Sequence, residues 1–108
     1  MHALILKYES ERIGFLVVQE KEDFSIVELL MAGIVERYRN KGYGRLLISW
    51  AQKWYADGTI IHARCHNESL IMAHLLKGQR FKIINQTDKG TLLEYVIPSG
   101  QGRFPKLP

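Results

Sequence analysis

Residues 27–44 of the chain read VELLMAGIVERYRNKGYG, and this stretch decides the fold prediction. An apolar run ends in a group of polar and basic residues, which contains glycines at positions 42 and 44. Glycine allows positive backbone dihedral angles and close approach of a ligand, and the first turn of a helix leaves amide donors free. The stretch therefore predicts a strand, a loop and the amino end of a helix, at a place suited to an anion.

Apolar segments before and within this stretch predict three consecutive strands. ALILKY (3–8), IGFLVVQE (13–20) and FSIVELLMAGIV (24–35) are rich in Ile, Leu, Val and Phe, and short charged connections separate them. This pattern favours an antiparallel meander. The third segment is the longest and most apolar, so we expect a central strand that is covered on both faces.

Apolar residues at three- and four-residue spacing predict a helix after the glycines. We expect one buried stripe made of Tyr43, Leu46, Leu47, Trp50, Ala51 and Trp54, with Gly58 as the left-handed cap. TIIHARC (59–65) predicts a strand, and LIMAHLLKG (70–78) predicts a second helix capped by Asn67 or Ser69. FKIINQ (81–86) and TLLEYVI (91–97), joined by TDKG, predict a closing hairpin.

The expected architecture is α/β, with a single mixed, mainly antiparallel sheet flanked by two main helices. The chain has 108 residues, 46% of them hydrophobic, which allows one core in residues 1–97. Residues 98–108 hold all three prolines and are expected to form a flexible tail. No apolar run has membrane-spanning length and no leader pattern precedes the first strand, so the expected location is the cytoplasm.

Cysteine and histidine usage argues against disulfides and metal. The lone Cys65 has no partner for an internal disulfide or a common zinc site, and we expect it to be a small strand residue. The four histidines fit no standard ligand spacing, since His62 and His66 fall in and beside a strand rather than a helix. We therefore expect no metal site.

The net charge of +4 is concentrated in one segment. Between Glu36 and Lys53 there is one acid, while the basic residues are Arg37, Arg39, Lys41, Arg45 and Lys53. Such a cluster indicates a local anion or a solvated basic face. The glycine spacing matches neither the dinucleotide-binding motif nor the P-loop, so the spacing alone leaves a structural turn and a phosphate cradle both open.

The order Arg39-x-x-Gly42-x-Gly44, following a long apolar strand and opening a helix, resembles the acyl-CoA-binding motif of the GNAT superfamily of N-acetyltransferases. The likeness extends from about Ala3 to Ile97, because the expected order of strands and helices is also that of a GNAT core. Residues 27–44 are most similar, without a gap, to the histone acetyltransferase branch. The resemblance implies acetyl-CoA as the cofactor and acetyl transfer to a primary amine, which attacks the thioester directly in a ternary complex.

The resemblance also implies roles for individual residues. Amides of the loop and the first helical turn would hold the coenzyme A pyrophosphate, and the preceding strand would run beside the pantetheine arm. The amide near Met31 or Ala32 would polarise the acetyl carbonyl. Asn67 matches an asparagine that contacts this arm, although its spacing to Phe81 is longer than usual. The implied cofactor-binding residues are Met31, Ala32, Gly33, Ile34, Val35, Arg39, Asn40, Lys41, Gly42, Tyr43, Gly44, Arg45 and Asn67.

Two catalytic candidates follow from the same comparison. Glu28 falls on the position of the carboxylate that serves histone acetyltransferases as general base, a role that typically contributes about 10²–10⁴-fold. A lysine amine, with a pKa of about 10.4, must lose its proton before it attacks a thioester. The alternative is that Glu28 faces solvent or pairs with a basic neighbour. Leu75 or Leu76 replaces the family's usual tyrosine acid, so His74 is either a substitute acid or a boundary histidine.

The acceptor and the partners stay open at this stage. The chain begins near the second strand of the family core, so we expect an acceptor side that is open to a macromolecule or completed by a second copy as a homodimer. The amine would belong to a small molecule or to a protein lysine or N-terminus. The second hypothesis is a GNAT-shaped module without turnover that binds an anionic partner such as nucleic acid through its basic loop and tail, with affinity that falls steeply with salt.

Overall fold

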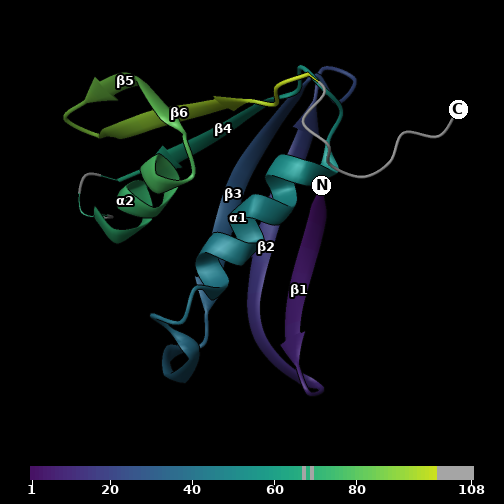
Figure 1. Ribbon diagram of the computed structural model, residues 1–108. Helices are drawn as coiled ribbons and strands as arrows, with labels where there is room; N and C mark the ends of the chain where they lie inside the picture. The colour runs from purple at the N-terminus through teal and green to yellow at the C-terminus, as the bar shows by residue number, and fades with distance from the viewer. Residues whose placement is uncertain (67, 69, 100–108) are drawn as a thin grey trace, which may run out of the picture.

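The computed structural model describes residues 1–66, 68 and 70–99, and its elements follow one another in the predicted order (Figure 1). The amino-terminal elements are β1 (His2–Tyr8), β2 (Glu11–Lys21), β3 (Ile26–Ile34), the 3₁₀ turn η1 (Glu36–Tyr38) and α1 (Tyr43–Trp54). The remaining elements are β4 (Ile60–Cys65), α2 (Leu70–Gly78), β5 (Lys82–Thr87) and β6 (Gly90–Val96). None of the helices in this described part of the chain combines the length and the apolar character that a membrane span requires.

The strands form one six-stranded sheet in the order β1-β2-β3-β4-β6-β5. The first three strands are an antiparallel meander, β4 lies parallel to β3, and β6 is antiparallel to both β4 and β5. The predicted mixed, mainly antiparallel sheet with two main helices is therefore confirmed. β3 is a central strand, as expected, because it pairs with β2 on one side and β4 on the other.

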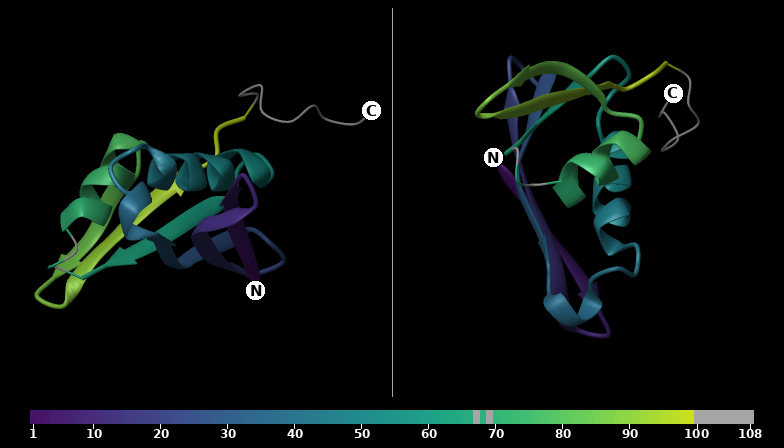
Figure 2. Two further views of the ribbon diagram at one scale, coloured as in Figure 1. Left: turned by 90° about the horizontal axis from the view of Figure 1, so that it is seen from below. Right: turned by 90° about the vertical axis from the view of Figure 1, so that its left-hand side faces the viewer.

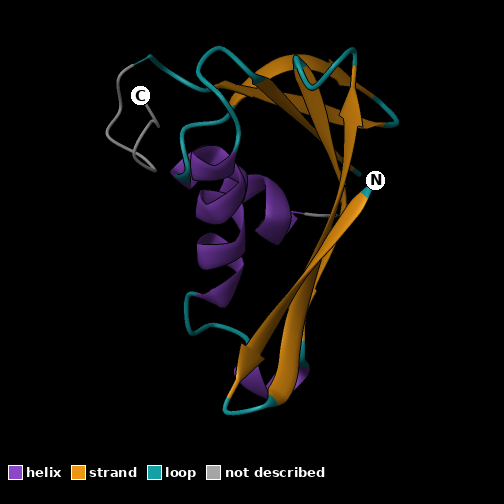
Figure 3. Cartoon of the chain, turned by 90° about the vertical axis from the view of Figure 1, so that its right-hand side faces the viewer, coloured by secondary structure: helices purple, strands orange, loops and turns teal. Residues whose placement is uncertain are grey.

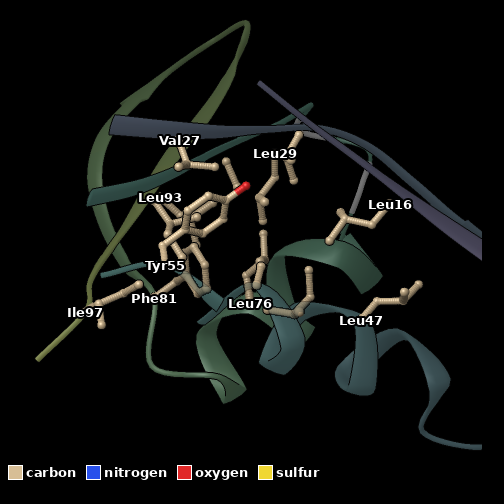
Figure 4. Packing of buried hydrophobic residues seen from close by; sticks show 14 of the residues in the cluster. Leu16, Val27, Leu29, Leu47, Tyr55, Leu76, Phe81, Leu93 and Ile97 are labelled. Carbon is tan, nitrogen blue, oxygen red and sulfur yellow. The ribbon is translucent and has the colours of Figure 1, made fainter. Parts of the chain in front are cut away.

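Both helices pack on the same face of the sheet (Figures 2 and 3). The core lies between them and the sheet, where Leu16, Leu29, Leu47, Leu76 and Leu93 are all at most 9% exposed (Figure 4). Coverage of both faces of β3 was expected and is wrong. Within the described residues no helix lies over the second face, because the two β-α connections both place their helices on the first (Figure 2).

The buried stripe of α1 differs from the predicted one. Leu47, Ile48 and Ala51 are buried as part of the core, whereas Leu46 and Trp54 are 51% and 56% exposed. Half-buried Gly44 lies on the same side of the helix, where an added side chain would meet Leu75 of α2, and a glycine contributes no apolar signal to the sequence pattern. The stripe was therefore assigned about one residue out of phase.

The end of α1 also corrects the predicted cap. The helix ends at Trp54, and Tyr55 follows in an extended conformation as its cap residue. Gly58 does adopt a positive φ of 84°, but it lies in the turn that leads to β4. Trp50 is partly buried and stacks on Trp54, with ring centroids 5.0 Å apart.

The pairing between β3 and β4 is short, and this places the site. Only residues 26–29 of β3 have partners in β4, namely residues 60–63. Beyond Leu29 and Ala63 the two strands separate, while β4 continues along β6 as far as Cys65. A register shift against β2 leaves Leu30 as an extra residue in β3, because Val17 pairs with Met31 and Val18 with Leu29. Beyond Leu29, the backbone groups of β3 on the side toward β4 therefore have no partner in β4 and can bind a ligand.

Candidate active site

The loop before α1 presents free backbone donors. Asn40 and Gly42 both have positive φ values, 62° and 89°, and Gly42 is the amino-terminal cap of the helix. Gly42 makes no side-chain capping bond, and its carbonyl accepts the first helical hydrogen bond, from the amide of Leu46 at 3.0 Å. The amides before Leu46 in the first turn therefore have no partner within the helix, and no acidic residue lies in that turn. This end of α1 suits an anion.

The basic side chains around this loop fall into two groups. Arg37 forms an ion pair with Glu11, and Arg39 donates its Nε–H to a backbone carbonyl at the end of β3, 2.9 Å away. Lys41 and Arg45 are exposed and have no ion-pair partner among the described residues. Lys41 and Arg45 are thus available to an anionic ligand, and Arg39, which lines the cleft described next, keeps its full charge because its partner is a neutral carbonyl.

A cleft of about 1060 Å³ runs beside this loop. Its walls are the end of β3, the loop with the first turn of α1, and the beginning of α2. Nine of the predicted cofactor-binding residues line it: Ala32, Gly33, Ile34, Arg39, Asn40, Gly42, Tyr43, Gly44 and Arg45. Val35 and Lys41 are exposed near its rim but do not line it.

The α2 wall of this cleft was missed by sequence reasoning. Leu70, Ile71, Met72 and Leu75 line it, and the first two are 73% and 86% exposed. Their spacing is that of an ordinary amphipathic helix, so the sequence gave no reason to separate them from the core. Only the tertiary position of α2 shows that they face the glycine loop.

A second, smaller cleft of about 230 Å³ lies where β3 and β4 separate. Met31 and Ala32 line it from β3, and Ala63, Arg64 and Cys65 line it from β4. Three residues are common to both clefts, Ala32, Ile48 and Met72, so the two clefts lie next to each other. Burial raises the pKa of the Cys65 thiol, which keeps it protonated and makes it part of the wall rather than a nucleophile.

Glu28 of β3 lines neither cleft, although the next residue, Leu29, lines the smaller one. Its carboxylate accepts a hydrogen bond from Lys21 Nζ at 2.6 Å and lies 3.7 Å from Arg64 Nε, and 17% of its side chain is exposed. Arg64 itself lines the cleft. This geometry corresponds to the alternative stated above, in which Glu28 pairs with a basic neighbour, and its role as general base stays a prediction.

The other catalytic candidate lies apart from the clefts. His74 is exposed on α2 and is not among the residues that line either cleft, so its role as an acid stays a prediction without geometric support. Leu75 and Leu76, at the family's usual tyrosine position, line the larger and the smaller cleft respectively. Asn67 and the tail residues 100–108 lie outside the described residues.

Solved structures with the same fold come from several organisms. *Arabidopsis thaliana* NAA60 in complex with acetyl-CoA superposes with a TM-score of 0.66 at 21% identity, over 81% of this chain and 66% of that one. A Bacillus subtilis acetyltransferase in complex with CoA superposes with a TM-score of 0.70 at 20% identity, over 87% of this chain and 75% of that one. The Escherichia coli ribosomal-protein-S18-alanine N-acetyltransferase superposes with a TM-score of 0.72 at 15% identity, over 95% of this chain and 74% of that one. The chain thus spans just under two thirds of the length of the *Arabidopsis* protein.

Sequence comparison identifies the family. No curated protein sequence gave a significant match to the chain. The sequence pattern of the acetyltransferase (GNAT) family matches residues 1–79, which include the glycine loop, α1 and both strands that border the smaller cleft. The chain therefore belongs to the acetyltransferase (GNAT) family.

Proposed function

We propose that this chain binds acetyl-CoA and transfers the acetyl group to a primary amine, which attacks the thioester directly in a ternary complex. The observation that carries the proposal is a pair of adjacent clefts, one at the amino end of α1 and the other at the gap between β3 and β4. The larger cleft has backbone donors and basic side chains at the glycine loop, and the smaller cleft is lined mainly by apolar side chains together with Arg64. A long ligand with an anionic head and a slender thioester arm would fit this pair of clefts.

The head of the coenzyme would bind at the glycine loop. Free amides of the first turn of α1 and the positive end of its dipole favour a pyrophosphate, and the missing side chain of Gly42 leaves those amides uncapped. Lys41 and Arg45 would supply the mobile charge. The *Arabidopsis* and *Bacillus* relatives, which hold acetyl-CoA and CoA, support this assignment by their shared fold.

The pantetheine arm would run along the open side of β3. Beyond Leu29 this strand has no partner in β4, so its backbone groups on that side can pair with the amides of the arm. The thioester would then lie in the smaller cleft, where the amide of Met31 or Ala32 could donate to the developing oxyanion. The acceptor would approach from the sheet face that carries no helix in the described residues.

Two variants of α1 test the coenzyme assignment. Arg45→Glu reverses a charge in the first turn, and Lys53→Glu makes the same change in the last turn of the same helix. Isothermal titration with acetyl-CoA should show affinity at least about tenfold weaker for Arg45→Glu, because a charge-assisted hydrogen bond is worth about 1.5–3 kcal/mol. Lys53→Glu should bind like the wild-type protein. Equal weakening by both variants would show that acetyl-CoA responds to net charge and not to the glycine loop.

A further inference from the structure

An apolar block lies on the uncovered face of the sheet, the face that carries neither α1 nor α2 (Figure 2). Its residues are register partners in two neighbouring rows across β1, β2 and β3: Ala3, Val17 and Met31, then Ile5, Phe15 and Gly33. Side chains alternate along a strand, and the intervening residues Leu4, Leu16 and Ala32 pack in or against the core on the other face. The ring of Phe15 lies over Gly33, where an added Cβ would be 2.6 Å from it. The block therefore points away from both helices.

The smaller cleft opens on the same face, beside this block. Its exposed lining residues are Leu30, Met31 and Arg64, whereas most of the others are buried. Arg64 lies between buried Ala63 and Cys65 along β4, so its side chain points to the uncovered face, as that of Met31 does. The mouth of the cleft therefore lies between Met31 and Arg64, and the first row of the apolar block begins at this mouth.

The size of the block and the charges beside it limit what can bind there. At the usual strand spacing, three strands by two alternate residues cover on the order of 200 Å², whereas a stable interface takes about 800 Å² from each partner. The block thus suits one or two apolar side chains and is too small for a second folded copy. Lys21 and Arg64 lie 2.6 and 3.7 Å from the Glu28 carboxylate, so positive charge exceeds negative charge beside the mouth. An acceptor with several cationic groups is disfavoured there.

We infer that the acceptor is a peptide amino terminus with apolar first residues, whose side chains dock on the apolar block; this inference rests on the proposed function. The α-amine and the side chain of a first residue share one carbon atom, so an α-amine at the mouth brings that side chain to Met31. The second apolar side chain then lies over β2 and β1. A lysine amine ends a four-carbon stem, which keeps the peptide backbone and the neighbouring side chains away from the mouth.

Ile5 is the residue of the block that separates acceptor docking from coenzyme binding. It lies on the edge strand β1, is 47% exposed and lines neither cleft. Ile84 is a matched control, because it lies on the opposite edge strand β5, is 48% exposed and also lines neither cleft. Ile5→Ser and Ile84→Ser remove the same half-exposed side chain, and only the first of them changes the apolar block.

The test is acetyl transfer by the full chain, measured as kcat and KM. The probes are the peptides Leu-Leu-Gly-Ser-Gly-Ser and Ser-Ser-Gly-Ser-Gly-Ser, the amino-capped peptide acetyl-Leu-Leu-Lys-Gly-Ser, and spermidine. The Leu-Leu peptide should have a kcat/KM at least about tenfold above each of the others, because burial of a leucine side chain is worth about this factor or more. Ile5→Ser should raise KM for the Leu-Leu peptide about fivefold at unchanged kcat and leave the Ser-Ser peptide unaffected. Ile84→Ser should behave like the wild-type protein with both peptides.

Binding measurements separate this inference from the proposed function. Both variants should bind acetyl-CoA with wild-type affinity, and weaker binding by Ile5→Ser alone would overturn the inference, because Ile5 would then act through the coenzyme site. Equal transfer to all probes would also overturn it and keep the proposed function, as would the same change in KM for Ile5→Ser and Ile84→Ser. Isothermal titration of the peptides into the protein saturated with coenzyme A is the second readout. Preference for the Leu-Leu peptide there, without transfer to any probe, would contradict the proposed function and support the docking site.

Discussion

At the residue scale, Glu20 joins the first strands to the end of α1. Its carboxylate accepts hydrogen bonds from Tyr55 Oη at 2.9 Å and from His2 Nδ1 at 2.6 Å, and only 8% of its side chain is exposed. Burial alone would raise the pKa of Glu20, but the hydrogen bonds from Tyr55 and His2 outweigh it and lower the pKa below its usual value of 4.5. Burial and the hydrogen bond to Glu20 raise the pKa of Tyr55, so the phenol remains a donor.

A pH dependence of stability follows from Glu20. Because its pKa is lower in the folded chain than in the unfolded chain, the carboxylate stabilises the fold above about pH 4.5, and this contribution is lost as the pH falls through the folded value. Glu20→Gln should therefore flatten the dependence of the free energy of unfolding on pH in this acidic range. Urea unfolding at a series of pH values measures this dependence. Glu22→Gln, at an exposed acid next to the strand end, should keep the wild-type slope, and an unchanged slope for Glu20→Gln would refute the role.

At the scale of one element, α1 has two apolar sides with different energetic roles. Ile48 is 2% exposed and packs in the core, while Leu46, two positions earlier, is 51% exposed. Ile48→Ala should lower the free energy of unfolding by about 2–5 kcal/mol, because it leaves a cavity between α1 and the sheet. Leu46→Ala should change it by about 0.5 kcal/mol or less. Thermal or urea unfolding of both variants measures these changes. If the stripe predicted from sequence were the buried one, Leu46→Ala would be the more destabilising variant and Ile48→Ala the milder one.

The same helix shows what the sequence could and could not predict. Its start at Tyr43 after two glycines was predictable, because loop chemistry and apolar spacing agree there. Its buried face was not, because Gly44 on that face gives no apolar signal, and exposed Trp54, which stacks on partly buried Trp50, has the spacing of a core position. For the site, the glycine motif located the loop, whereas the α2 wall depends on contacts between distant segments that local patterns do not contain.

At the scale of the whole molecule, the sheet has two different sides. One side holds the core and both helices, and the other is uncovered in the described residues (Figure 3). The polar residues Glu28, His62, Glu94 and Lys82 are register partners across β3, β4, β6 and β5. The order of the elements was predictable in outline because short charged turns separate the first three strands, and helices separate β3 from β4 and β4 from β5. That only one face of β3 is covered by helices was not predictable from sequence. β3 is apolar along its length because one of its sides is buried in the core and because several of its residues line the clefts.

The central claim is that the two adjacent clefts hold acetyl-CoA, and thermal unfolding of the full chain tests it most directly. Acetyl-CoA, coenzyme A and heparin are compared at low and moderate salt. Both coenzymes, at about 100 times their Kd, should stabilise the fold by about 2.7 kcal/mol at moderate salt, a rise in Tm on the order of 10 °C. A shift with heparin alone, lost at moderate salt, would indicate the anion-binding module instead. No shift with either coenzyme at either salt concentration would contradict the account.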